Sequence, residues 1–160
     1  MEIKELGKKD IPAIWNINQQ GLPGTGEVTH EEVETLLEFA SFSVGIFEHD
    51  ELLGFVICMP PGTQYSSPNY SWFNDKYDSF VYVDRIAVSE QHRNKSIGTH
   101  LYDFVVEIAM NIGAPVVAEV SLKPPNPGSM RFHSRFQFED VGVLHHGTKS
   151  VTMLMRPTDS

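Results

Sequence analysis

Residues 80–112 restrict the fold more than any other part of the chain, because a buried strand, a short polar turn and an amphipathic helix follow one another directly. The run FVYVDRIAV at 80–88 is rich in β-branched and aromatic residues, which is typical of a central strand. Apolar residues then recur on one helical face, at Ile97, Leu101, Phe104, Val105, Ile108 and Ile112. Gly113 follows as the expected helix end.

The rest of the chain carries strand and helix patterns without a repeat or a linker. Strand-like runs lie at residues 2–6, 41–48, 52–59, 114–122, 137–146 and 149–157, and helical patterns lie at 11–20, 29–40 and from Asn126 onward. Asp10 with Pro12, and the capping box Thr29–Glu32, mark two helix starts. This order predicts an α+β fold with a mixed sheet, and 160 residues fit a single domain spanning 1–160.

Residues 60–78 depart from these patterns. Tyr65, Tyr70, Trp72, Phe73 and Tyr77 are scattered there among prolines, serines and asparagines. Two interpretations are open: a surface loop held down by its aromatic rings, or a lid or wall over a ligand pocket.

The charge of the chain limits its partners. A formal net charge of −9 at pH 7 argues against binding to nucleic acid and suits a small cationic or amine ligand better. The single cysteine, Cys58 in GFVICMP, cannot form a disulfide within the chain and is expected in a buried strand. The N-terminus MEIKELGKKDIPAIW has no apolar signal core, so we expect a cytoplasmic protein with no membrane partner.

The turn QHRNKSIG at 91–98 predicts an anion site at a helix start. First-turn amides and the helix dipole both favour a negative charge there. Gly98 allows close approach to the backbone, while Ser96 stands where another glycine is expected and can still adopt helical torsions. By itself, however, this pattern also fits an ordinary helix start.

In its context the turn resembles the acyl-CoA-binding motif of the GNAT (Gcn5-related N-acetyltransferase) superfamily. The segment DRIAVSEQHRNKSIGTHLY matches a strand ending in apolar-x-Val, then Arg/Gln-x-x-Gly-x-Gly/Ala, then a helix with an early Leu. The segment NPGSMRFHSRFQF resembles Asn-x-x-Ala-x-x-apolar-Tyr-x-x-x-Gly-Phe of the same superfamily, matched in place or in kind by Asn126, Ser129, Phe132 and Phe138. Ser96, His133 and Gln137 stand where glycine, tyrosine and glycine are usual.

The resemblance implies a mostly antiparallel sheet of about six or seven strands with a splayed central parallel pair, flanked by about four helices. It also implies acetyl-CoA as the cofactor. Backbone groups of Ile86, Ala87 and Val88 would bind the pantetheine arm and the thioester carbonyl. Amides of the turn would bind the pyrophosphate, namely those of Asn94, Lys95, Ser96, Ile97, Gly98 and Thr99. Arg93 and Lys95 would add positive charge or remain solvated, and Asn126, Ser129 and His133 would contact the cofactor arm.

Three residues are candidates for moving protons. Glu119 in VVAEVSL is an acid within an apolar strand, where burial raises a carboxyl pKa toward the range of a general base, although it could instead lie at a sheet edge or pair with Arg85. Asp84 in YVDRIAV is the competing base. His133, at the position of the usual tyrosine acid, could protonate the leaving thiolate, or merely form a local hydrogen bond.

Together these features predict an N-acetyltransferase that transfers acetyl directly to the amine of a small-molecule or amino-acid-like acceptor. Residues 21–27, Tyr65, Tyr70, Trp72 and Glu119 would form the acceptor site. The alternatives are a non-catalytic acyl-CoA-binding or sensing domain, and a protein N-terminal acetyltransferase, which an aromatic lid would disfavour. The histidines show no metal-ligand spacing, so we expect no metal, and a homodimer through the C-terminal edge strand remains open.

Overall fold

The computed structural model describes residues 1–158, which form seven β-strands and five α-helices. The strands are β1 (Glu2–Glu5), β2 (Phe42–Glu48), β3 (Glu51–Met59), β4 (Val81–Val88), β5 (Val116–Lys123), β6 (Glu139–His146) and β7 (Lys149–Arg156). The helices are α1 (Ile11–Gln20), α2 (His30–Phe39), α3 (Pro68–Lys76), α4 (Ile97–Ile112) and α5 (Pro127–Arg135). The strands make one sheet in the order β1-β2-β3-β4-β5-β7-β6, which confirms the predicted α+β fold and its mixed sheet.

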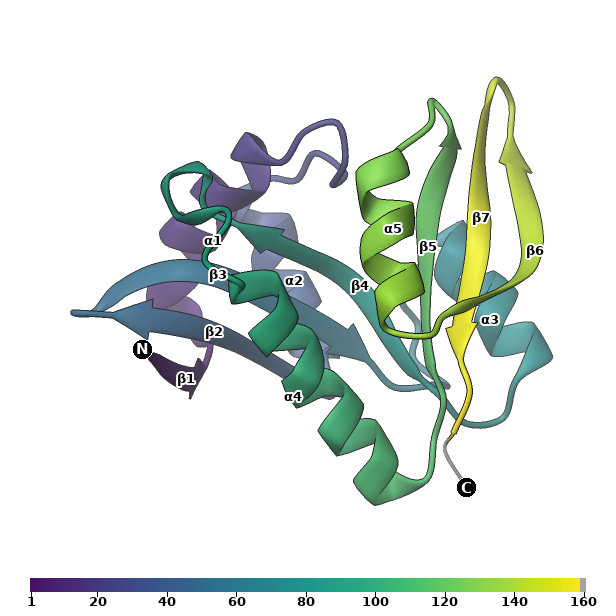
Figure 1. The fold of residues 1–160 in the computed structure, drawn as a ribbon, viewed down its shortest axis with the longest axis horizontal. Helices are drawn as coiled ribbons and strands as arrows, with labels where there is room; N and C mark the ends of the chain where they lie inside the picture. Colours follow the sequence, from purple (N-terminus) through teal and green to yellow (C-terminus); the bar gives the residue numbers. More distant parts are fainter. Residues whose placement is uncertain (159–160) are drawn as a thin grey trace.

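The sheet is antiparallel except between β4 and β5, which run parallel and soon part (Figure 1). They pair at two positions alone, Val81 with Val116 and Tyr82 with Val117. The register between β3 and β4 also skips Asp84, because Cys58 pairs with Val83 and Ile57 with Arg85. Such a bulge bends a strand and increases its twist, so the splay begins at the position where β4 is irregular.

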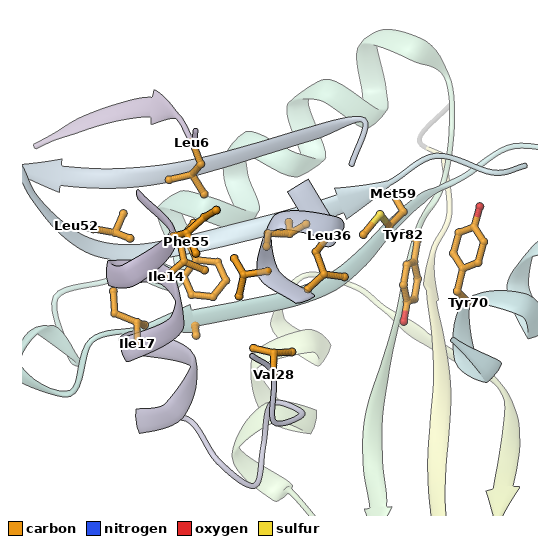
Figure 2. Packing of buried hydrophobic residues seen from close by; sticks show 14 of the residues in the cluster. Leu6, Ile14, Ile17, Val28, Leu36, Leu52, Phe55, Met59, Tyr70 and Tyr82 are labelled. Atoms are coloured by element: carbon orange, nitrogen blue, oxygen red, sulfur yellow. The ribbon is translucent and has the colours of Figure 1, made fainter. Parts of the chain in front are cut away.

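Helices cover both faces of the sheet: α4 and α5 lie in front of it in Figure 1, and α1, α2 and α3 behind it. The strands feed two cores because successive residues point to opposite faces. Phe55 and Ile57 of β3 pack with α1, α2 and α3, and Val56 and Cys58 pack with α4. Figure 2 shows the first of these cores, where Ile14 and Ile17 of α1 and Leu36 of α2 gather near Phe55.

Helix α3 lies inside the segment that we expected to be a loop, so that expectation was wrong for residues 68–76. Ser67 caps the helix by accepting a hydrogen bond from the amide of Tyr70, and Pro68 occupies its first turn. Tyr70 (1% exposed) and Phe73 (0% exposed) then enter the core. Burial of these two aromatic rings holds the helix on the sheet, and so short a helix shows no clear amphipathic pattern in its sequence. The structure therefore has five helices, where about four were expected.

Helix α4 begins at Ile97 and ends at Gly113, whose φ of 71° is the left-handed conformation of a helix C-cap, as the sequence predicted. The buried face differs from the expected one at its end, because Ile112 is 64% exposed. Tyr102, which the apolar pattern left out, is instead fully buried beside Leu101. Among residues 1–158, no helix combines the length and the apolarity needed to cross a membrane.

Candidate active site

The parting of β4 and β5 opens a cleft with a volume of about 710 Å³. Its walls come from the α1–α2 connection, the segment before α3, the two strands, β7 and the start of α5. The lining side chains with polar groups include Thr25, Tyr65, Ser67, Asn69, Asp84, Arg85, Tyr102, Glu119, Ser121, Asn126, Ser129, His133 and Lys149. The cleft thus brings together all three predicted proton-transfer residues, Glu119, Asp84 and His133.

Glu119 lies on β5 and faces the side of the sheet that carries α3. The Tyr82 hydroxyl lies 2.9 Å from Oε1 and 3.0 Å from Oε2, and the Asn69 amide donates to Oε1 at 2.9 Å. Burial, and next the charge of Asp84, raises the pKa of Glu119 from 4.5 to about 7, while these two hydrogen bonds lower it in part. At Glu119 β5 pairs with Met153 of β7, whereas its pairing with β4 has already ended at Val117, so Glu119 lies where β5 borders the cleft. At neutral pH this carboxylate can accept a proton.

Asn69 binds Glu119 from the first turn of α3 and is itself held by a residue of β6. His146 of β6 places Nε2 2.9 Å from Asn69 Oδ1. Because an amide oxygen only accepts, His146 donates there, and the Asn69 nitrogen is left to donate to Glu119. Neither Asn69 nor His146 was predicted, since the two are distant in sequence from Glu119 and carry no motif.

Asp84 is engaged on both carboxylate oxygens. Arg85 forms an ion pair with Oδ2 at 2.7 Å, and the Tyr65 hydroxyl donates to Oδ1 at 2.6 Å. Arg85 also donates to Asn18 Oδ1 and to the Gly26 carbonyl, both at 3.1 Å, which ties β4 to the α1–α2 connection. Arg85 therefore pairs with Asp84 rather than with Glu119.

His133 lies in the cleft wall on α5, 4% exposed, and both ring nitrogens have partners. Nδ1 lies 2.8 Å from the Ser129 carbonyl, and Nε2 lies 2.6 Å from the Tyr102 hydroxyl of α4. Burial lowers the pKa of His133 below its usual value. Tyr102 is a cleft residue that sequence reasoning missed, because it follows Leu101 on α4 and resembles one more core position.

Two residues of the turn before α4 adopt left-handed torsions: Asn94 with φ of 72°, and Ser96 with φ of 60° and ψ of 23°. Ser96 therefore does not adopt the helical torsions that a serine could have at this position. This conformation is the one that glycine adopts without strain, so Ser96 does what the usual glycine does at a cost in backbone energy. Ile97, Gly98 and Thr99 follow in helical conformation, and the first helical bond runs from the His100 amide to Ser96.

The backbone amides of Ile97, Gly98 and Thr99, at the start of α4, are suited to bind an anionic group such as a pyrophosphate. No acidic residue lies in the first turn of α4, and first-turn amides have no acceptor within their own helix. A side-chain carbon built at Gly98 would meet Phe132 no closer than 3.5 Å, so the backbone there is approachable. Arg93 reaches the carbonyls of Val88 and Gln20, and Lys95 reaches His92, which places both cations beside the turn.

The turn lies beyond the carboxyl end of β4, outside the residues that line the cleft. Ile86 lines the cleft, and Ala87 and Val88 continue the strand toward the turn. Asn126 caps α5 by accepting a hydrogen bond from the Ser129 amide at 3.2 Å, and both residues line the cleft. A continuous path of backbone thus leads from the turn along β4 into the cleft.

Of the three aromatic residues expected at an acceptor site, Tyr65 alone lines the cleft. The Tyr70 hydroxyl donates to the Pro60 carbonyl at 2.6 Å and accepts from the Thr63 amide at 3.0 Å, so Tyr70 pins a loop within the core. Trp72 packs against Gly142 of β6, away from the cleft. Tyr70 and Trp72 are therefore structural residues of α3 in this fold.

Cys58 is fully buried and contributes no reactive group at the cleft surface. Burial, and next the charge of Asp84, raises the pKa of its thiol well above the usual value. Across residues 1–158, no group of three or more His, Cys, Asp or Glu side chains is arranged to hold a metal ion.

Comparisons with known proteins agree with this geometry. The family model described as "Acetyltransferase (GNAT) family" matches residues 11–138. No curated protein shows a significant sequence match to the chain. Ard1 from Thermoplasma volcanium has a similar structure, with a TM-score of 0.79, 17% identity and coverage of 99% of this chain and 98% of that one.

Two further solved structures share the fold. The ribosomal-protein-S18-alanine N-acetyltransferase from Escherichia coli has a TM-score of 0.75 and 13% identity, and covers 99% of this chain and 94% of its own. NAA60 from Arabidopsis thaliana, solved with a bisubstrate analogue, has a TM-score of 0.73 and 19% identity, with coverage of 96% and 95%.

Proposed function

Because the chain belongs to the GNAT acetyltransferase family, we propose that it is an acetyl-CoA-dependent N-acetyltransferase acting on the amine of a small-molecule or amino-acid-like acceptor. The main support for this proposal is the Glu119 carboxylate. It lies where β4 and β5 part, and burial raises its pKa to about 7. A base of that pKa is suited to accept a proton from an amine near neutral pH.

The donor supplies an acetyl thioester. The left-handed Asn94 and Ser96 and the amides of Ile97, Gly98 and Thr99 would hold its pyrophosphate at the start of α4. The edge of β4 that β5 leaves free, from Asp84 to Val88, would offer backbone groups to the pantetheine arm and the thioester carbonyl. Asn126, the N-cap of α5, and Ser129 within α5 would border the arm in the same cleft.

Glu119 would act on the acceptor side. Asp84 forms an ion pair with Arg85, whereas the hydrogen bonds to Glu119 come from the neutral groups of Asn69 and Tyr82, so Glu119 is the better placed of the two to take the proton. The charge of Asp84 keeps the proton affinity of Glu119 high. Asp84 would therefore tune the base rather than serve as the base.

The acceptor would enter beside residues 21–26 and Tyr65. An ammonium group gains from the two nearby carboxylates and from the face of an aromatic ring. Lys149, at the start of β7, lines the same cleft and would favour an acceptor that carries a carboxylate beside its amine. These features support an acceptor with the charge pattern of an amino acid.

The test combines turnover with donor binding. Free thiol released from acetyl-CoA is measured against a panel of amines for the wild type and for Glu119→Gln, and acetyl-CoA affinity is measured by calorimetry. We expect the variant to lose on the order of 100-fold in kcat while its affinity stays within about twofold of the wild type. Turnover that survives in Glu119→Gln contradicts the assignment of the base, and donor binding without turnover on any amine indicates an acyl-CoA sensor.

Two variants of Gly98 test whether the turn before α4 binds the pyrophosphate of acetyl-CoA. Gly98→Pro removes one amide at a helix position that tolerates proline, and Gly98→Ala keeps the amide and adds a carbon with room for it. We expect Gly98→Pro to weaken acetyl-CoA binding at least about tenfold, and Gly98→Ala to weaken it less. Equal affinities of both folded variants and the wild type would exclude this amide from the binding site.

A second candidate is acetylation of a protein N-terminus. The lid that would have narrowed a peptide groove is replaced by α3, whose aromatic residues Tyr70 and Phe73 are buried in the core. The similar structures include a ribosomal-protein alanine acetyltransferase. Short peptides with free N-termini belong in the same amine panel, and a preference for them of more than about tenfold in kcat/KM over free amino acids would select this candidate.

A further inference from the structure

His146 of β6 reaches the proposed base through one intervening side chain. Its Nε2 lies 2.9 Å from Oδ1 of Asn69, and the Asn69 amide nitrogen lies 2.9 Å from Oε1 of Glu119. β6 is the second strand from β5 in the sheet, and α3 lies behind β6 and β7 in Figure 1, so Asn69 on α3 connects two strands that are not paired with each other. Two hydrogen bonds in series therefore join the β6–β7 hairpin to Glu119.

The chemistry of the three groups fixes the direction of both hydrogen bonds. An ionised carboxylate only accepts, so the Asn69 nitrogen is the group that faces an ionised Glu119. The amide oxygen then faces His146, which donates from Nε2 whether the ring is neutral or charged, provided that Nε2 carries the hydrogen. Removing that donor removes the contact that separates this orientation of the amide from the reversed one, in which the amide oxygen would repel the carboxylate.

We propose that His146 is a positioning residue for the base: through Asn69 it keeps an N–H group directed at Glu119 and thereby sets the proton affinity of the carboxylate. This inference rests on the proposed acetyl transfer. Glu119 takes the proton of the acceptor amine in that reaction, while the hydrogens on His146 Nε2 and on the Asn69 amide stay where they are. His146 therefore acts on the reaction without exchanging a proton with it.

The hydrogen bond from Asn69 opposes the larger effects on Glu119. Burial, and next the charge of Asp84, raises the pKa of Glu119 to about 7, and the hydrogen bonds from Tyr82 and Asn69 act against that rise. A lost or reversed Asn69 contact should therefore raise the pKa of Glu119 further. The titratable and charged groups that surround Glu119 by hydrogen bond, by charge or in the walls of the same cleft are Tyr65, Tyr82, Asp84, Arg85, Tyr102, His133 and Lys149. A substitution at position 146 leaves all of these groups in place.

The same hairpin also carries the proposed acceptor contact. His146 and Lys149 are partners in the β6–β7 ladder, on either side of the turn at 147–148, so their side chains point to one face of the sheet. Lys149 lines the cleft, and His146 holds Asn69. One pair of hairpin residues thus places an acceptor-binding charge beside the support of the base.

The first test measures the base itself, in the protein without substrates. Carbon-13 NMR follows the ionisation of the Glu119 carboxyl, whose signal is assigned by its absence in Glu119→Gln. His146→Phe keeps a ring and removes both nitrogens, and we expect the pKa of Glu119 to rise above its wild-type value in this variant. His146→Gln can place an amide nitrogen near the position of Nε2 and should restore the wild-type titration. An unchanged titration in His146→Phe overturns the inference.

His145→Phe is the matched control, because the neighbouring strand position is exposed and points to the opposite face of the sheet. It should leave the titration of Glu119 unchanged. A shift as large as that of His146→Phe would show a general effect of altering the hairpin and would overturn the inference. Nitrogen-15 NMR should also find hydrogen on Nε2 of His146 in the wild type, and a ring with hydrogen on Nδ1 alone contradicts the proposed hydrogen bonds.

A double variant tests whether His146 acts through Asn69. Asn69→Ala breaks the same series of hydrogen bonds at its second member and should shift the titration of Glu119 in the same direction as His146→Phe. Once Asn69 is gone, His146→Phe should add no further shift, because the two residues then act as one unit. Additive shifts would mean that His146 reaches Glu119 by another route and would overturn the role of Asn69.

The second test asks whether this contact matters for turnover. We expect kcat/KM of His146→Phe to be about threefold to tenfold below the wild type at about pH 6, and within about twofold of it at about pH 8.5, where Glu119 is ionised in both proteins. A loss by the same factor at both pH values shows a structural role and overturns the inference. A wild type without turnover on any amine refutes the proposed function, while the titration of Glu119 still decides whether His146 acts on this carboxylate.

Discussion

Glu119→Gln should lower kcat on the order of 100-fold and, above neutral pH, make the protein more stable. Glutamine keeps the shape of the protonated carboxyl and can still accept a hydrogen bond from Tyr82, but it carries no charge. The folded protein holds the pKa of Glu119 at about 7 against an ordinary value of 4.5, and the first cause is burial. Each tenfold rise in proton affinity corresponds to about 1.4 kcal/mol, so an ionised Glu119 destabilises the fold by at most about 3 kcal/mol. Because the side chain lines a cleft open to water, we expect a value of about 1–3 kcal/mol.

The sign of the effect depends on pH. Below the unfolded pKa of 4.5 both states are protonated, and the carboxyl and the amide should differ by a constant amount. Between 4.5 and about 7 the unfolded state ionises while the folded state keeps its proton, so the wild type loses stability as the pH rises. Above about 7 the difference reaches its full size and stays there.

Urea unfolding of both proteins across this pH range measures the difference directly. The free energy of unfolding of the variant minus that of the wild type should rise between 4.5 and about 7 and then level off. Glu107→Gln, on an exposed position of α4, is the matched control for replacing a glutamate outside the cleft. A flat or falling curve for Glu119→Gln would refute the raised pKa and, with it, the choice of Glu119 as a base for neutral pH.

Three further predictions concern the turn before α4, the proposed base Glu119 and the contact between β3 and α4. Ser96→Gly should raise the free energy of unfolding by up to about 1 kcal/mol in urea titrations, because glycine adopts φ of 60° without strain; a loss of stability would contradict this. Asn69→Ala removes a hydrogen bond that lowers the pKa of Glu119, so the acid limb of the pH profile of kcat/KM should move to higher pH, and an unmoved limb would show that the contact does not tune the base. Gly54→Ala places a carbon 2.8 Å from Ile97 and 3.0 Å from a backbone oxygen, which should lower the free energy of unfolding by about 1–3 kcal/mol. If this contact displaces the start of α4, acetyl-CoA binding measured by calorimetry should weaken, whereas unchanged binding would mean that α4 does not move.

The sequence predicted the sheet and most helices because their signals are local. The run at 80–88 is rich in β-branched and aromatic residues, and the apolar residues from Ile97 onward have helical spacing. Thr29 with Glu32 forms its capping box at 3.0 and 3.1 Å. Helix α3 was missed because its buried side is made of two aromatic residues in nine positions, which is too few to form a stripe. The torsions of Ser96 were also beyond prediction, since an αL serine is rare and nothing in its neighbours requires one.

The proposed site was predictable where a residue stands out from its own strand or helix. Glu119 stands out as an acid among valines, and the cleft does contain it. Tyr102, Asn69 and His146 do not stand out, because each acts through a partner 31 to 77 residues away in the chain. Such contacts depend on how α3, α4 and β6 pack around β5, and periodicity within one element contains no information about that.

The short pairing of β4 with β5 divides the sheet into two lobes, β1–β4 and β5–β7, that share two residue pairs at one end of their boundary. Opening this boundary breaks fewer interstrand hydrogen bonds than separating any other neighbouring strands. A ligand lying in the cleft would bridge the lobes where the backbone does not. Amide hydrogen exchange should therefore find the lobes as separate cooperative units in the free protein, and donor binding should slow exchange along both facing strands at once.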